Sequence, residues 1–214
     1  MARTRSENYD GIRDGILASA TALFAKQGYM RTSISELADA CQLSRGALYH
    51  YFDSKEAILF EILDVHVRKM IADVEQAISR QQQTVDQFRD AIGAIVALNA
   101  HSSAEQRLIL NDLTFLAPEE QLAIKNLERK LVDTISDLLV KLDREGRMVK
   151  RTRKVYTMMM FGILNYSHTW YDAKGGVDPK EFADRVVDLF LNGFLPPAAQ
   201  RETVAKRGAG HTAA

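Results

Sequence analysis

The stretch LSRGALYHYFDSKEAILFEIL, residues 43–63, decides how the first part of the chain folds. Ser44 can cap a helix that runs to about Tyr51, because a serine hydroxyl accepts a hydrogen bond from the free N–H groups of a first helical turn. Four ring-bearing side chains stand in a row where this helix ends: Tyr49, His50, Tyr51 and Phe52. Consecutive helical residues point about 100° apart, so at most two of the four can face one core. The others are therefore expected to have a partner outside that core.

Two further helices are predicted before this stretch. Apolar residues recur with the 3.6-residue period of an amphipathic helix over residues 10–27, and Gly28 can end that helix with a left-handed cap. Ser33 and Glu36 then have the spacing of a capping box, and a single apolar stripe follows as far as Cys41. These patterns predict a short second helix directly before the helix of the opening stretch.

The helix after Ser44 has an unusual first turn. It contains Arg45, Gly46 and Ala47 and no acidic residue, so its start is cationic and sterically open. The free N–H groups and partial positive charge of a helix N-terminus attract anions, and two short helices joined by about three residues form a helix-turn-helix that can enter the DNA major groove. Two packed helices of an ordinary bundle would show much of the same pattern, so both interpretations stay open at this point.

The remainder of the chain is predicted to be helical as well. A fourth helix, capped by Asp53 or Ser54, runs through the seventies and joins the first domain to the second without a Gly/Ser-rich linker. Further helices are predicted over residues 84–100, 103–115, 118–145, 152–173 and 178–194. No proline precedes Pro118, and no regular alternation of Val, Ile and Thr indicates strands. The expected fold class is therefore all-α.

Composition excludes several classes of protein. The chain has 28 basic and 28 acidic residues, so any binding of nucleic acid must come from the local placement of charge. The single cysteine, Cys41, excludes an internal disulfide, and no run approaches the ~20 apolar residues that span a bilayer. The five histidines are scattered, and neither a catalytic motif nor a phosphate loop is present. We expect a cytoplasmic protein without membrane contact, cofactor, metal or catalytic activity.

The run ALFAKQGYMRTSISELADACQLSRGALYHYFDSKEAIL, Ala22–Leu59, resembles the N-terminal domain of the TetR family of transcriptional regulators along its whole length. The resemblance implies a helix-turn-helix domain over residues 1–55 and a helical ligand-binding and dimerisation domain over residues 56–195. Residues 196–214 hold too few apolar residues to pack, and we expect them to be disordered.

The resemblance also implies which residues meet an operator in double-stranded DNA. Thr32 and Ser33 are expected to contact phosphate. The start of the third helix is expected to meet base edges or neighbouring phosphates, through Ser44, Arg45, Gly46 and Ala47. The remaining expected phosphate contacts are Tyr49, His50 and Lys55, and Tyr51 could reach a phosphate instead of packing inward. Arg45 is the only long bidentate donor of this helix, so we expect it to read a guanine.

The last two helices indicate a homodimer. Residues 156–168 are mostly apolar around the full helix, and the final helix places Phe182, Val186, Phe190 and Phe194 at successive i+4 positions. A helix that is apolar all round must be buried on more than one side, which a second subunit would achieve. Two subunits would set two recognition helices about 34 to 36 Å apart, so we expect a near-palindromic operator.

Polar residues within the apolar helix are candidates for an effector site. Phe161, Asn165, His168 and Asp172 follow one helical face, and Met158 and Trp170 lie close by in the sequence. These residues could make hydrogen bonds in the core or dimer interface, or they could line an apolar pocket with a few orienting groups. We name Met158, Phe161, Asn165, His168 and Trp170 as the candidate effector residues.

Family members usually bind a small molecule in this domain and release DNA in response. The ending NYSHTWYDAKGGVDPKEFADRVVDLFLNGF is similar to that of members that respond to acyl-CoA esters in catabolic pathways. The expected function is therefore a dimeric repressor that a small apolar effector, such as an acyl-CoA ester, releases from its operator. Two alternatives are a regulator of multidrug efflux and a helical protein-interaction module that does not bind DNA.

Overall fold

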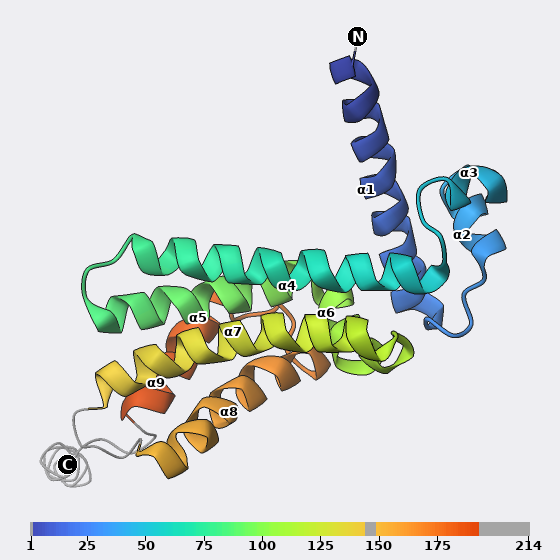
Figure 1. Ribbon diagram of the computed structural model, residues 1–214. Helices are drawn as coiled ribbons and strands as arrows, with labels where there is room; N and C mark the ends of the chain where they lie inside the picture. Colours follow the sequence, from blue (N-terminus) through green and yellow to red (C-terminus); the bar gives the residue numbers. More distant parts are fainter. Residues whose placement is uncertain (1, 144–148, 193–214) are drawn as a thin grey trace, which may run out of the picture.

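The computed structural model describes residues 2–143 and 149–192, and within these ranges it contains helices and no strands (Figure 1), which confirms the all-α prediction. The first helices are α1 (Ala2–Gln27), α2 (Ile34–Ala40) and α3 (Arg45–Tyr49). They are followed by α4 (Lys55–Ser79), α5 (Thr84–His101), α6 (Ser103–Asn111), the 3₁₀ turn η1 (Leu113–Phe115), α7 (Pro118–Leu142), α8 (Lys150–Tyr166), the 3₁₀ turn η2 (Ser167–Thr169) and α9 (Pro179–Asn192).

The predicted start and stop signals of the first two helices are confirmed. Gly28 has φ of +90° and donates its N–H to the Phe24 carbonyl at 2.9 Å, which ends α1 in a left-handed cap. The buried ring of Tyr29 folds back onto Phe24, with 5.1 Å between ring centres. At the start of α2, the Ser33 hydroxyl accepts from the Glu36 N–H and the Glu36 carboxylate accepts from the Ser33 N–H. The capping box therefore fixes where α2 begins.

Helix α4 connects the two ends of the molecule. Figure 1 shows it running from the α1–α3 cluster across the length of the larger helical layer, alongside α5. One face of α4 is buried along its whole length, from Ile58 to Val74. Because the helix is continuous and closely packed, a displacement at its far end would also move its first turn.

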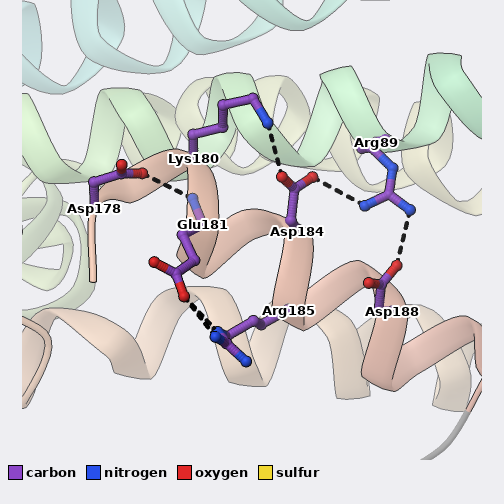
Figure 2. A network of polar contacts seen from close by, with 7 residues as sticks. All are labelled: Arg89, Asp178, Lys180, Glu181, Asp184, Arg185 and Asp188. Atoms are coloured by element: carbon purple, nitrogen blue, oxygen red, sulfur yellow. Dashed lines mark hydrogen bonds and ion pairs between the residues drawn. The ribbon is translucent and has the colours of Figure 1, made fainter. Parts of the chain in front are cut away.

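Helix α9 packs against α5 and is held there by charge (Figure 2). The guanidinium of Arg89 on α5 donates to Asp184 at 2.9 Å and to Asp188 at 2.8 Å. Lys180 donates to the second oxygen of Asp184, and the neighbouring Lys180 and Arg89 cations hold the pKa of Asp184 below its usual range. The predicted cap of α9 is also present, since the Glu181 N–H donates to the Asp178 carboxylate at 2.8 Å.

Several boundaries differ from the sequence predictions. Helix α1 begins at Ala2 rather than near residue 10, α3 is five residues long rather than about eight, and α6 ends at Asn111 before η1. The helix predicted over residues 152–173 ends at Tyr166, where η2 replaces it. The predicted helix ends at residues 145 and 194 and the expected disorder of residues 196–214 lie outside the described residues, and the division between residues 55 and 56 falls in the first turn of α4 and stays a prediction.

Candidate functional site

Helices α2 and α3 form a compact helix-turn-helix. Gln42, between them, adopts φ of +55°, and the Leu43 N–H donates to the Ala38 carbonyl at 2.9 Å to close the turn. The Ser44 hydroxyl accepts from the Ala47 N–H at 3.1 Å, which caps α3 as predicted. Leu48 is completely buried and holds the inner face of α3 against the core. The other face of this short helix is free to meet a partner.

The exposed face of α3 carries the predicted base-reading residues. Arg45 and Gly46 are exposed, and Arg45 forms no hydrogen bond or ion pair with the described residues. A methyl group built at Gly46 would meet only the Ser44 hydroxyl, at 3.9 Å, so nothing within the described structure requires a glycine there. Tyr49 is 49% exposed at the end of the same helix. This surface carries a positive charge and a small side chain, as a helix that approaches DNA closely needs.

The two residues predicted before α2 are placed differently from each other. Thr32 is only 1% exposed, and its hydroxyl donates to the Gly28 carbonyl at 2.9 Å while its N–H donates to the Tyr29 carbonyl at 3.2 Å. Both of its donors are therefore used inside the protein. Ser33 is exposed at the N-terminus of α2, but its hydroxyl donates to Glu36 at 2.8 Å. In this conformation Ser33 offers a phosphate only its position at the helix terminus.

Lys55 is turned toward the loop between α1 and α2. Its ammonium donates to the backbone carbonyls of Tyr29 at 3.1 Å and Thr32 at 3.0 Å and lies over the Tyr29 ring. The Tyr29 hydroxyl in turn donates to Glu56 at 2.8 Å, and burial and this nearby carboxylate raise the Tyr29 pKa well above its usual range. The first turn of α4 is thus tied directly to the loop that positions α2.

The four ring-bearing residues at the end of α3 and just after it point inward or outward as predicted, and Tyr9 of α1 packs against two of them. Phe52 is buried, and Tyr49 and His50 are exposed. Tyr51 is half-buried, and its ring packs against Tyr9 of α1 with 4.8 Å between ring centres. Tyr9 also meets His50 edge-on. The sequence prediction omitted Tyr9, because it began the first helix near residue 10 and so left Tyr9 outside it.

Exposed apolar side chains gather on α8 and α9. Met159 of α8 is 57% exposed and Leu189 of α9 is 47% exposed. Both line a cleft of about 270 Å³ between α7, α8 and α9, which Tyr156, Ile163 and Phe190 also line. Apolar surface of this kind, contiguous across two helices, is typical of an interface with another protein chain.

A chain of polar groups crosses the interior from α8 to α4. The buried His66 of α4 donates from Nε2 to the Gln106 side-chain oxygen at 3.2 Å, and Gln106 donates to the Asn165 side-chain oxygen at 3.5 Å. The Asn165 backbone carbonyl accepts from His168 Nδ1 at 2.6 Å. Burial lowers the pKa of His66, so its imidazole is neutral. The chain joins the helix that leads to α3 with the segment that follows α8.

The candidate effector residues do not form one cluster. Phe161 is buried in the core, whereas Met158 and Trp170 are exposed at 46% and 62%. Asn165 belongs to the polar chain, and His168 lies in η2 and lines a cavity with Asn99 and Asp172. The predicted continuous face from Phe161 to Asp172 is wrong beyond Tyr166, because α8 ends there.

No helix within the described ranges is long and apolar enough to cross a membrane. Two family models match the chain, "Bacterial regulatory proteins, tetR family" at residues 16–62 and "Tetracyclin repressor-like, C-terminal domain" at residues 81–194. The first match covers the helix-turn-helix, and the second covers α5 to α9, which is more than half of the chain.

Individual proteins agree with these matches. The chain is 45% identical over 202 residues to the HTH-type transcriptional repressor KstR2 of Rhodococcus jostii, covering 87% of this chain and 93% of the relative. A TetR-family transcriptional regulator from Bordetella parapertussis has the same fold, with a TM-score of 0.82, 35% identity, and coverage of 87% of this chain and 98% of that one. AibR in complex with isovaleryl coenzyme A and operator DNA has a TM-score of 0.74 at 24% identity, covering 84% and 98%, and shows the fold alone.

The helix-turn-helix geometry, the match of both domains and the identity to a full-length relative point to one family. Members of this family are transcription factors without catalytic activity. The chain therefore belongs to the TetR family of bacterial regulatory proteins, as a DNA-binding transcriptional regulator and not an enzyme.

Proposed function

We propose that the protein is a cytoplasmic repressor that binds a near-palindromic operator as a homodimer and leaves it when a small apolar effector binds. The observation that carries the proposal is the exposed first turn of α3, where Arg45 has no partner among the described residues and Gly46 is open to close approach. The relative KstR2 is named a transcriptional repressor, which supports this direction of regulation.

Contacts to DNA would come from the first turn of α3 and from the two exposed rings at its end. Arg45 would read a guanine through a bidentate pair, which contributes about 1 to 3 kcal/mol of discrimination. The α3 start, including Ser44 and Ala47, and the exposed rings of Tyr49 and His50 would contact neighbouring phosphates. Tyr51 would act mainly by packing on Tyr9, and Thr32 by shaping the loop.

A homodimer would place two such domains on one operator. The apolar cleft between α7, α8 and α9 and the exposed Met159 and Leu189 support an interface in which α8 and α9 of one subunit meet those of its partner. A two-fold axis brings the same surface of both subunits together, so the apolar surface of α8 and α9 alone can form the interface. The two recognition helices would then lie about one DNA turn apart.

Release by an effector requires a path from the larger domain to α3. Helix α4 supplies it, because its far end packs against α5 and α7 while Lys55 holds the loop before α2. A coupling of about 1 to 3 kcal/mol between the two sites would be enough for regulation. The structural neighbour AibR binds isovaleryl coenzyme A together with operator DNA, which supports an acyl-CoA ester as the effector class.

The test is a fluorescence anisotropy titration of DNA from the region upstream of the protein's own gene, compared with random DNA of equal length. Wild type should prefer the upstream DNA, and Arg45→Ala should bind both equally while its sedimentation coefficient stays unchanged. Arg80→Ala, an exposed arginine at the far end of α4, is the matched control. Equal binding of both DNAs by wild type at low salt would contradict the proposed function, and an unchanged preference in Arg45→Ala would remove Arg45 from the reading set.

A further inference from the structure

A second cavity lies next to the buried polar chain. Its volume is about 270 Å³, and it is enclosed by the end of α5, the start of α6 and the segment that follows α8. Its walls combine apolar surface with the polar side chains of Asn99, Ser103, Ser167, His168, Tyr171 and Asp172. A cavity of this size holds a small molecule or one end of a larger one. Its polar lining distinguishes it from the apolar cleft between α7, α8 and α9.

Asn99 is the side chain in this lining whose hydrogen bonding is incomplete. It is only 8% exposed, and its side-chain oxygen Oδ1 is buried and accepts no hydrogen bond from the described residues. Buried amide oxygens in folded proteins are nearly always paired, because leaving one unpaired is costly. A ligand in the cavity that donates a hydrogen bond to this oxygen would complete the hydrogen bonding of Asn99. Asn99 is thus an acceptor that lacks a donor.

Three polar groups of the lining are already used as donors. The Ser167 hydroxyl donates to the Leu164 carbonyl, the Tyr171 hydroxyl to the Val177 carbonyl, and His168 Nδ1 to the Asn165 carbonyl. The hydroxyl oxygens and the second imidazole nitrogen of His168 keep lone pairs that can accept. The charged groups of the lining, Asp172 and Lys174, have opposite signs and offset each other. These acceptors suit an uncharged ligand that donates hydrogen bonds.

We propose that this cavity binds the polar head of the effector, a small uncharged group that donates hydrogen bonds through a hydroxyl or an amide N–H, with Asn99 as its main acceptor. The proposal rests on the proposed function and names the chemistry of its regulatory site. Two kinds of effector carry such a group. One is an apolar alcohol, and the other is the pantetheine arm of an acyl-CoA, which contains two amide N–H groups and a hydroxyl.

The position of the cavity links it to DNA binding. His168 lines the cavity and donates to Asn165, whose side chain accepts from Gln106, which in turn accepts from His66 on α4. A ligand that moves His168 or the η2 segment would disturb this chain at its first member. Because His66 lies on α4, the helix that directly follows α3, occupation of the cavity would change the position of the DNA-binding domain.

The experiment measures the binding of three small molecules to the full chain by NMR, through the change in the signal of the Asn99 side-chain amide. Panthenol carries the amide and hydroxyl groups of the pantetheine arm without charge, and pantothenate is its anionic counterpart. The third probe, 4-methylpentan-1-ol, represents an apolar alcohol. We expect panthenol or the alcohol to saturate the Asn99 signal with a millimolar Kd, and pantothenate to bind at least about tenfold more weakly.

The variant Asn99→Leu should weaken the binding of the preferred probe by at least about tenfold, whereas the exposed Asn126→Leu should not change it. Which of the two uncharged probes binds decides between an acyl-CoA and an alcohol. The proposal is overturned if neither uncharged probe binds at about 10 mM, a result that would mean the cavity holds water. It is also overturned if pantothenate binds as well as the uncharged probes, or if Asn99→Leu changes the Kd by less than about twofold. Operator binding by the same unliganded samples is measured separately, so a failure of the proposed function would be seen independently.

Discussion

The ammonium of Lys55 lies 4.3 Å from the centre of the Tyr29 ring, and it donates to the carbonyl of the same residue. A cation at this distance over an aromatic ring is attracted by the negative face of the ring. Lys55 begins α4, and Tyr29 follows the end of α1. This pair therefore fastens the helix that crosses the larger domain to the loop that precedes the helix-turn-helix.

Replacing this lysine should affect both folding and DNA binding. Lys55→Ala removes two hydrogen bonds from a charged donor, each of which contributes about 1.5 to 3 kcal/mol before screening by solvent, so the midpoint of thermal unfolding should fall by several degrees. As a proposed phosphate contact, Lys55 would use the third N–H of its ammonium. We therefore expect weaker binding to operator and random DNA alike, and a salt dependence whose slope falls by about 1.

Lys69→Ala is the control for this prediction, since Lys69 is exposed on the same helix and pairs with Asp73 on the next turn. It should change neither the unfolding midpoint nor the salt slope appreciably. A reduced midpoint with an unchanged slope would mean that Lys55 is a tether and does not contact DNA.

Gly46→Ala separates a role in folding from a role in DNA binding. A methyl group at this position meets only the Ser44 hydroxyl at 3.9 Å, and alanine is favoured over glycine within helices by roughly 0.5 to 1 kcal/mol. Thermal stability should therefore stay equal or rise. If DNA approaches α3 closely, the added methyl group should weaken operator binding by about tenfold or more in an anisotropy titration.

Gly93→Ala provides the matched comparison, because nothing lies within 4 Å of a methyl group built there and Gly93 is in α5. It should show the same gain in stability with unchanged operator affinity. Unchanged affinity in Gly46→Ala as well would show that the open first turn of α3 is not needed for close approach.

Much of the DNA-binding domain could be predicted because its signals are local. The Ser33–Glu36 box, the Ser44 cap and the Gly28 cap each depend on residues within four positions of one another, and each is confirmed. The outward orientation of Tyr49 and inward orientation of Phe52 were expected from helical geometry together with the family resemblance. Local sequence is enough where the interaction itself is local.

The effector residues could not be predicted in the same way, because their surroundings come from distant parts of the chain. Residues 166–173 contain no proline or glycine, so the sequence carried no stop signal where α8 changes to a 3₁₀ turn. Asn99 lies on α5, far in sequence from His168, and only tertiary packing brings both to one cavity. Lys55 similarly matched a phosphate-binding position of the family. Its hydrogen bonds to the Tyr29 and Thr32 carbonyls could not be predicted, because tertiary packing brings these distant residues together.

A charge placed on the apolar surface of α8 and α9 should prevent dimerisation. Leu189→Arg puts a cation where Leu189 now lines the cleft with Met159, and burying an unpaired charge in an interface costs several kcal/mol. Analytical ultracentrifugation should therefore show monomers at concentrations where wild type is dimeric, and operator affinity should fall with it. Leu122→Arg, an equally exposed leucine at the start of α7, should remain dimeric. Monomeric wild type would remove the interface from the proposal.

His66 should make stability depend on pH in mildly acidic solution. Its pKa is lowered in the folded protein, chiefly because burial disfavours the charged form, although Gln106 and the carboxylate of Glu105 act in the opposite direction. The unfolded chain has an ordinary imidazole with a pKa near 6.5, so below about pH 6.5 it binds a proton that the folded protein does not. The contribution of His66 to the free energy of unfolding is therefore fully present above about pH 6.5. As the pH falls below that value, the free energy of unfolding decreases by up to about 1.4 kcal/mol per pH unit, until the pH reaches the folded-state pKa of His66.

Urea unfolding at pH 7.5 and 5.5 measures this loss. His66→Gln keeps a side chain that can donate to Gln106 but cannot be protonated, so its free energy of unfolding should fall less than that of wild type between the two pH values. His101→Gln, which changes an exposed histidine, should retain the wild-type dependence. Parallel curves for wild type and His66→Gln would mean that the pKa of His66 is the same in the folded and the unfolded chain. In that case burial does not disfavour the charged form of His66, and the coupling argued from a neutral imidazole in the polar chain between α8 and α4 would have to be revised.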